Sequence, residues 1–130
     1  ADFRGADFSG AWITAADLSN SLLGASTLAG VSLARACMKE VDLTGAFAVG
    51  ADFRSTILNG AIMRAANLSG ANLREASLID ADLSLADLVG ADLRGAQLDG
   101  AVLNGSRHDG TTRWPETFKP LTSGGIESHE

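Results

Sequence analysis

The feature that most limits what this chain can fold into is a five-residue period that runs without interruption to residue 105. Written in fives, the chain reads ADFRG, ADFSG, AWITA and onward to AVLNG, which makes twenty-one consecutive units. The third residue of every unit is apolar and is usually leucine, and the first is alanine in sixteen units. The second is often Asp or Asn, and the fifth is often Gly. Self-similarity at a fixed short period predicts a repeat architecture.

A period of five fits neither regular secondary structure. On an α-helix it would move the apolar residue by about 140° per unit and scatter it around the axis. On a continuous strand an odd period would send successive leucines to opposite faces. The chain must therefore turn a corner every five residues, with the first and third residues pointing inward and the second, fourth and fifth pointing outward.

The units ADLSN, ANLSG, ANLRE, ADLVG and ADLRG resemble the A(D/N)LXX pattern of the pentapeptide-repeat family. The resemblance implies an all-β fold, a right-handed quadrilateral parallel β-helix with four repeats per coil and about five coils. Arg54, Arg74 and Arg94 recur at an interval of twenty residues, which favours four sides.

We expect three segments: the β-helix over residues 1–105, a C-terminal cap over 106–120 and a disordered tail over 121–130. A β-helix exposes apolar core and unpaired backbone at its ends, so a cap is required. Trp114 and Phe118 are the predicted capping residues, and the segment TRWPETFKP resembles the tail that closes some cyanobacterial members of the family. Nothing caps Phe3 and Phe8, which predicts either a missing upstream segment or an end-to-end homodimer.

Catalytic chemistry is not expected, because a filled β-helix offers no cleft in which a nucleophile, base or metal could be held. We predict no catalytic residue, no cofactor and no metal site. Cys37 is the only cysteine, and His108 and His129 have no second ligand at a recognisable metal spacing. His108 beside Asp109 is interpreted as a turn pair. The recurring glycines are interpreted as corners and not as phosphate-binding loops.

The formal net charge of −6 argues against direct binding of nucleic acid, which needs a surplus of clustered Lys and Arg. No apolar run is long enough to span a membrane, and no signal segment precedes the first repeat. The chain begins with Ala1 and not with Met, so we expect that something upstream was removed or not included. The compartment is left open between the cytoplasm and, if an upstream signal was cleaved, the thylakoid lumen or periplasm.

The acids at second positions have two interpretations; they are Asp2, Asp7, Asp17, Asp42, Asp52, Asp82, Asp87 and Asp92. Near a corner, Asp and Asn bind local backbone amides and stabilise the turn. Alternatively, the acids imitate DNA, as in family members that occupy the DNA-binding surface of type II topoisomerases. A body of about 24 Å would need roughly fourteen charges to match DNA. Residues 1–105 hold twelve acids and seven bases, a net charge of −5, so the turn interpretation is favoured.

Two sets of outward residues are candidate contacts. Arg54, Arg74 and Arg94 should stack on one face beside Asp52, Asn72 and Asp92, which makes a solvated ladder or a face that binds a partner or an anion. Apolar residues at second positions are the other set: Trp12, Leu22, Cys37, Phe47, Ile57 and Ile62. Of these, Trp12, Phe47 and Ile57 are the candidate partner contacts, although the set spreads over all four predicted faces. In the unit AFAVG, either the coil bulges to bring Phe47 inward or the ring is exposed, and we expect the bulge or partial burial.

The resemblance and the residues together predict a non-catalytic structural or protein-interaction module of the pentapeptide-repeat family, with an unassigned biochemical role and a protein partner. The alternative is a DNA-mimicking inhibitor or protector of DNA gyrase.

Overall fold

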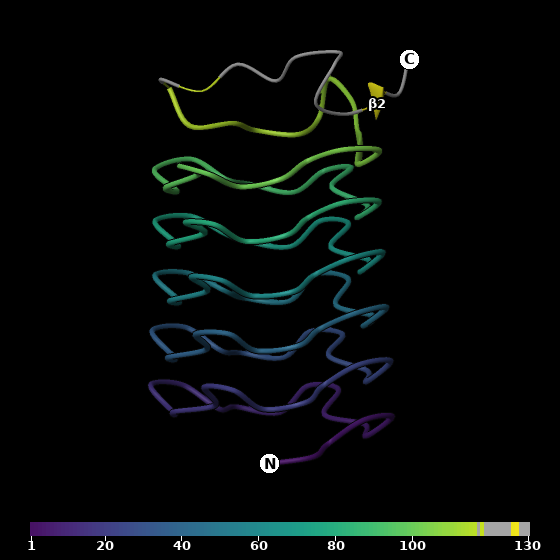
Figure 1. Ribbon diagram of the computed structural model, residues 1–130, viewed down its shortest axis with the longest axis vertical. Coiled ribbons are helices and arrows are strands. Elements are labelled where there is room, and N and C mark those ends of the chain that lie inside the picture. The colour runs from purple at the N-terminus through teal and green to yellow at the C-terminus, as the bar shows by residue number, and fades with distance from the viewer. Residues whose placement is uncertain (117, 119–125, 128–130) are drawn as a thin grey trace.

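The computed structural model describes residues 1–116, 118 and 126–127, and it shows a column of stacked coils with the N-terminus at one end (Figure 1). Parallel bridges join second-position residues that are twenty apart, from Asp2 with Leu22 to Asp82 with Val102. Each coil therefore takes four repeats, one per side. The predicted quadrilateral parallel β-helix is confirmed. Within the described residues, no helix is long and apolar enough to cross a membrane.

Every corner is a tight turn over the fourth and fifth residues of a repeat. The amide of the next first residue donates to the carbonyl of the third, as from Ala6 to Phe3 at 3.0 Å. The fifth residue has positive φ in all twenty-one repeats, for example 74° at Gly5 and 62° at Leu85. A positive φ at this third residue of the turn is the type II geometry that favours glycine. Ten corners nevertheless carry another residue, and Glu75 and Leu85 hold the left-handed conformation at a cost of about 1 kcal/mol or more each.

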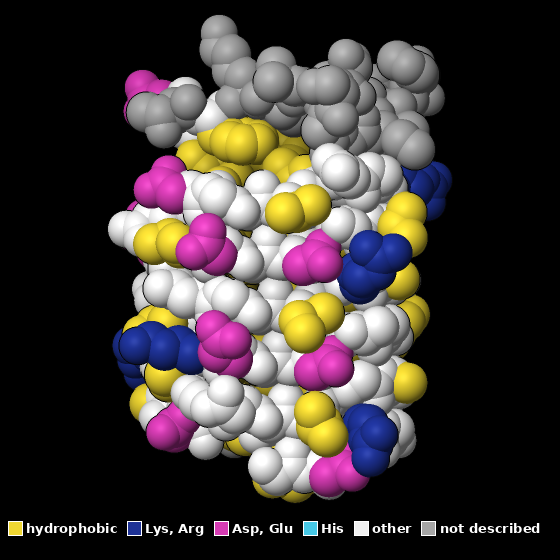
Figure 2. All heavy atoms as spheres, viewed as in Figure 1, with side chains coloured by type: hydrophobic (Ala, Val, Ile, Leu, Met, Phe, Trp, Pro, Cys, Tyr) yellow, Lys and Arg dark blue, Asp and Glu magenta, His cyan; other side chains and the backbone are white. Residues whose placement is uncertain are grey.

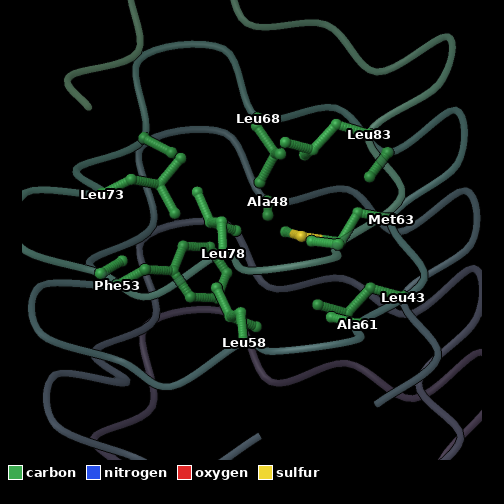
Figure 3. Close-up of a cluster of buried hydrophobic side chains, with 14 of the residues drawn as sticks. Leu43, Ala48, Phe53, Leu58, Ala61, Met63, Leu68, Leu73, Leu78 and Leu83 are labelled. Carbon is green, nitrogen blue, oxygen red and sulfur yellow. The ribbon is translucent and has the colours of Figure 1, made fainter. Parts of the chain in front are cut away.

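The core is built from the first and third positions, as predicted. From Leu23 to Leu103, every third-position residue is at most 8% exposed, and the first-position alanines over the same range are almost as well buried. Residues at the same position of successive coils lie above one another, so the interior consists of ladders that are mostly leucine and alanine, with Met63 and Phe53 among the exceptions (Figure 3). Two fourth-position residues, Ala34 and Ser84, are also buried, contrary to the outward assignment of that position.

Phe47 is not brought inward, and the prediction of a bulge is wrong. The ring is 46% exposed, and residue 47 bridges Thr27 and Asn67 in the regular register. Ala48 keeps the inward position, buried beside the larger side chains of Phe53 and Met63 (Figure 3). These large neighbours fill the space around the small alanine, so the coil needs no rearrangement.

The coil geometry continues past residue 105. Arg107 bridges Asp87, and Arg113 bridges Asp92 with one extra residue in the coil. His108 takes the inward third position and is 4% exposed, so its interpretation as a turn residue is wrong. Asp109 does form turn bonds: its carboxylate accepts the amide of Thr111 at 2.8 Å, and its amide donates to Thr112 Oγ1 at 3.2 Å.

A two-stranded parallel sheet lies at this end. β1 (Arg107–His108) pairs with β2 (Ile126–Glu127), in register Arg107 with Ile126. This pairing gives the free backbone edge of β1 a further strand. The disordered tail expected over 121–130 stays a prediction. Residues 121–125 and 128–130 lie outside the described part of the chain.

Trp114 and Phe118 pack against the end of the core. The Trp114 ring stands edge-on to His108 with centroids 5.2 Å apart, and the Phe118 ring lies 5.1 Å from Trp114 at 33°. At the other end Phe3 meets Phe8 edge-to-face at 5.5 Å, and both remain partly exposed beside an apolar hollow of about 190 Å³. The geometry suits the predicted cap, and the end-to-end homodimer stays a prediction.

Candidate partner-binding faces

The bridges assign every second-position residue to one of four faces, named here A to D in chain order. The fourth and fifth residues of each repeat belong to the same face and to the corner that follows it. Face A carries Asp2, Leu22, Asp42, Ile62, Asp82 and Val102, and face B carries Asp7, Thr27, Phe47, Asn67, Asp87 and Arg107. Face C carries Trp12, Ser32, Asp52, Asn72, Asp92 and Arg113, and face D carries Asp17, Cys37, Ile57, Ser77 and Gln97.

The second-position acids form turn bonds. In each of the eight, one carboxylate oxygen accepts the backbone amide two residues further on, as at Asp82, which accepts from Ser84 at 2.9 Å. Asn67 and Asn72 accept the same bond at 3.1 Å. The turn interpretation of these acids is confirmed.

These bonds favour the ionised carboxylate. The hydrogen bond from the Arg4 side chain lowers the pKa of Asp2 to about 2. Hydrogen bonds from residues 9, 19, 54, 84, 94 and 111 likewise lower the pKa of Asp7, Asp17, Asp52, Asp82, Asp92 and Asp109. The folded protein therefore binds fewer protons than the unfolded chain in acid.

We predict that the melting temperature falls as the pH drops below about 4. A depressed carboxyl pKa stabilises the fold above the unfolded value of 3.8 and loses that contribution as the pH falls through the folded value, which is about 2 for Asp2. Melting curves between pH 7 and 2 measure the effect. Asp82→Asn should reduce the acid dependence, because an amide keeps the turn bond, as at Asn72, and does not titrate. A melting temperature that rises in acid would contradict the prediction.

Face C brings the predicted arginine ladder together. Arg54 clamps Asp52 through Nε at 2.9 Å and Nη2 at 2.8 Å, and Arg94 clamps Asp92 at 2.9 and 2.7 Å. Arg74 stands between them beside Asn72, whose Oδ1 accepts only the Arg74 backbone amide. Among the described residues, none forms an ion pair with Arg74. Asp92, the ladder neighbour of Asn72, interacts with Arg74 through its charge, but Arg74 holds no carboxylate in the paired contact that Arg54 and Arg94 make.

Two shallow hollows border this ladder. The first, of about 360 Å³, is lined by Ala34, Arg35, Arg54, Ser55, Arg74 and Glu75. The second, of about 530 Å³, is lined by Arg94, Gly110, Thr111, Thr112, Arg113 and Trp114. Neither is an enclosed cleft, and guanidinium groups contribute to both. Within the described residues, no group of three His, Cys, Asp or Glu side chains could hold a metal ion.

Face A has a pattern that sequence reasoning missed. Its ladder alternates acidic with apolar side chains, and Figure 2 shows acidic and apolar groups alternating along one face. Leu22, Ile62 and Val102 are 37%, 41% and 42% exposed. Comparing second positions twenty residues apart would have revealed the alternation, because that is the spacing of ladder neighbours.

The apolar candidates do not form one patch. Trp12 is 88% exposed on face C, Phe47 lies on face B, and Ile57 is 36% exposed on face D above Cys37. Leu85 is 54% exposed at a corner. Sequence analysis did not identify it, because only second positions were considered as apolar contacts and the fifth position is usually Gly. Single exposed apolar residues on separate faces do not define an interface.

The family model for pentapeptide repeats matches residues 1–20, 36–74 and 66–105, with eight copies of the repeat. Together with the four-sided coils and the filled core, this match defines a class of right-handed β-helical repeat proteins. The chain belongs to the pentapeptide-repeat family, whose members are generally non-catalytic structural modules. Among curated proteins, a search found no match to the chain.

Solved structures of the family resemble the chain. The pentapeptide-repeat protein Rfr23 from the cyanobacterium Cyanothece 51142 is 26% identical with a TM-score of 0.71, over 83% of this chain and 90% of that protein. The protein alr5209 from Nostoc Pcc 7120 is 30% identical with a TM-score of 0.55, over 98% and 84%. QnrB1, a plasmid-mediated fluoroquinolone resistance protein, is 17% identical with a TM-score of 0.52 over 99% and 79%, which shows a shared fold alone.

Proposed function

We propose that this chain is a non-catalytic display module that presents face C to a protein partner. The filled, regular column holds its outward side chains at fixed spacing, so a partner meets a surface that is already ordered. Preorganisation of this kind lowers the entropic cost of association.

The observation that carries the proposal is the charge of face C. Face C and its following corner hold five basic residues against four acidic ones, a net charge of +1: Arg35, Arg54, Arg74, Arg94 and Arg113 against Asp52, Glu75, Asp92 and Glu116. The whole chain carries −6, so the rest of it carries −7. A positive face on an acidic protein favours a partner of opposite charge and orients its approach. The net charge of −7 on the rest of the chain disfavours binding of nucleic acid.

The arrangement of the acidic residues favours this function over the alternative, in which the protein imitates the DNA that gyrase binds. No face carries an acid at every second position among the described residues, because apolar side chains interrupt face A and Asn72 interrupts face C. Arg4, Arg54 and Arg94 also neutralise their neighbouring aspartates. A DNA mimic would need a continuous acidic stripe.

Two measurements test the proposal. In a supercoiling assay with purified bacterial DNA gyrase, we expect no inhibition at micromolar protein. A variant whose β-helix is disrupted serves as the control and should give the same result. In capture experiments, wild-type protein should retain a partner that a variant with Arg54, Arg74 and Arg94 all changed to Ala does not. Inhibition of gyrase that the disrupted control lacks, or identical capture by both proteins, would contradict the proposal.

A further inference from the structure

We propose that face C binds an acidic α-helix of the partner, laid along the long axis of the column with a carboxylate on each of Arg54, Arg74 and Arg94. This inference deepens the proposed function and rests on it. It specifies both the chemistry of the partner segment, an acidic helix, and its alignment with the long axis of the column.

Arg74, which holds no paired carboxylate, supplies the attraction for an acidic partner. Arg54 and Arg94 already hold Asp52 and Asp92, and their side chains are 57% and 49% exposed. Arg74 is exposed and has Asn72 where the other two have Asp. The guanidinium of Arg74 can therefore take a carboxylate in the paired, two-bond geometry that Asp52 uses with Arg54.

The surroundings of Arg74 admit such a group. The hollow of about 360 Å³ reaches Arg74 and Arg54 and includes the small residues Ala34 and Ser55. Arg35 lines the same hollow, so a carboxylate there meets a third cation. Glu75 does not fill it with an ion pair to any described residue, and its carboxylate lies over Gly95 of the next coil.

The spacing of the arginines selects a helix. Successive coils are separated by about 4.8 Å, so Arg54 and Arg94 stand about 9.6 Å apart along the axis. On an α-helix, residues i, i+4 and i+7 lie on one face and span about 10.5 Å. Side chains on one face of an extended strand recur at about 6.8 Å, and three of them would span about 13.6 Å. Three carboxylates of a helix therefore meet three arginines, whereas those of a strand lose register.

The upper end of the face continues the same chemistry. Arg113 bridges Asp92 in the next coil, and Arg94 and Arg113 both line the second hollow, of about 530 Å³. A helix extended by one or two turns would bring a further acidic residue to this end. Trp12, at the lower end of the same face and 88% exposed, is available to an apolar residue of the helix.

The test uses two synthetic alanine-rich peptides with the same composition and charge and with helicity checked by circular dichroism. One carries Glu at i, i+4 and i+7, and the other carries Glu at i, i+2 and i+5, which scatters the charges around the helix. Fluorescence anisotropy at low salt measures binding to the whole protein. We expect the first peptide to bind at least fivefold more tightly than the second, and the difference to shrink with added salt.

Matched charge reversals locate the site. Arg74→Glu should weaken binding of the first peptide about tenfold, whereas Arg64→Glu, at the equivalent fourth position of face A, should leave it within about twofold. Equal binding of the two peptides, no binding of either, or equal losses from the two variants would overturn the inference. Binding of duplex DNA that depends on Arg74, or a dimer that Arg74→Glu dissociates, would assign the face to a different occupant and overturn it as well. If the peptides fail while capture of a partner still needs the three arginines, the display module stands and the acidic helix is wrong.

Discussion

Leu68→Lys is expected to abolish the cooperative unfolding transition of this protein. Leu68 is 1% exposed, and Ala48 and Leu88 lie below and above it in the same ladder, equally buried. A lysine there could not reach water along the column, and no acid among the described residues points inward to pair with it. Burying an unpaired charge costs several kcal/mol or more, comparable with the 5–15 kcal/mol that stabilises a typical domain.

Thermal unfolding followed by circular dichroism measures this effect. Ile62→Lys is the matched control, because Ile62 is 41% exposed at an outward position of a neighbouring repeat and should tolerate the same charge. Leu68→Ala should fall between the two, with a loss of about 2–5 kcal/mol. A wild-type melting curve from Leu68→Lys would show that the third positions do not point inward.

The success of the inward assignment shows which features of this fold follow from sequence. Strand alternation and a fixed period determine which side chains are buried, so the positions of Leu68 and Phe53 could be predicted without coordinates. The turn bonds of Asp82 and Asn72 could be predicted for the same reason, because they are local. Arg54, Arg74 and Arg94 lie on one face as expected, since the period of the coil is a multiple of the repeat.

The features of the fold that the sequence did not reveal depend on side-chain volume or on contacts between segments that are distant along the chain. The unit that contains Phe47 was expected to disturb the coil, but the buried side chains of Phe53 and Met63 lie beside Ala48 in the core. A local sequence pattern does not show how neighbouring coils compensate for a small residue. His108 was placed in a turn because SRHDG no longer matches the repeat, although Ser106 and His108 still occupy inward positions. The pairing of β1 with β2 joins segments nineteen residues apart, and no local pattern predicts such a contact. Arg74 lacks a paired carboxylate because residue 72 is Asn. This difference becomes evident only when Asn72 is compared with its ladder neighbours Asp52 and Asp92.

Trp114→Ala is expected to destabilise the C-terminal end by about 3 kcal/mol, the lower part of the range for removing a buried tryptophan, because Trp114 is only partly buried. Its ring packs on His108 and Phe118, and its loss would expose His108 and the last layer of the core. The chain has two tryptophans, so Trp12→Ala is the matched control: that ring is 88% exposed, and its removal should leave the melting temperature unchanged. Equal effects of the two changes would contradict the predicted capping role of Trp114 and Phe118.

Hydrogen exchange separates a cap from an ordinary core contact. In a stacked repeat protein each coil contacts only its neighbours, so removing a cap frays the last coil first. In Trp114→Ala, the amides of Leu88 and Leu93, which donate to Arg107 and Arg113 at 2.7 and 2.6 Å, should exchange faster. The amide of Leu33, which donates to Asp52 at 2.8 Å far below, should keep its protection. Uniformly faster exchange would mean instead that Trp114 stabilises the column as one unit, because a cap acts on its own end first.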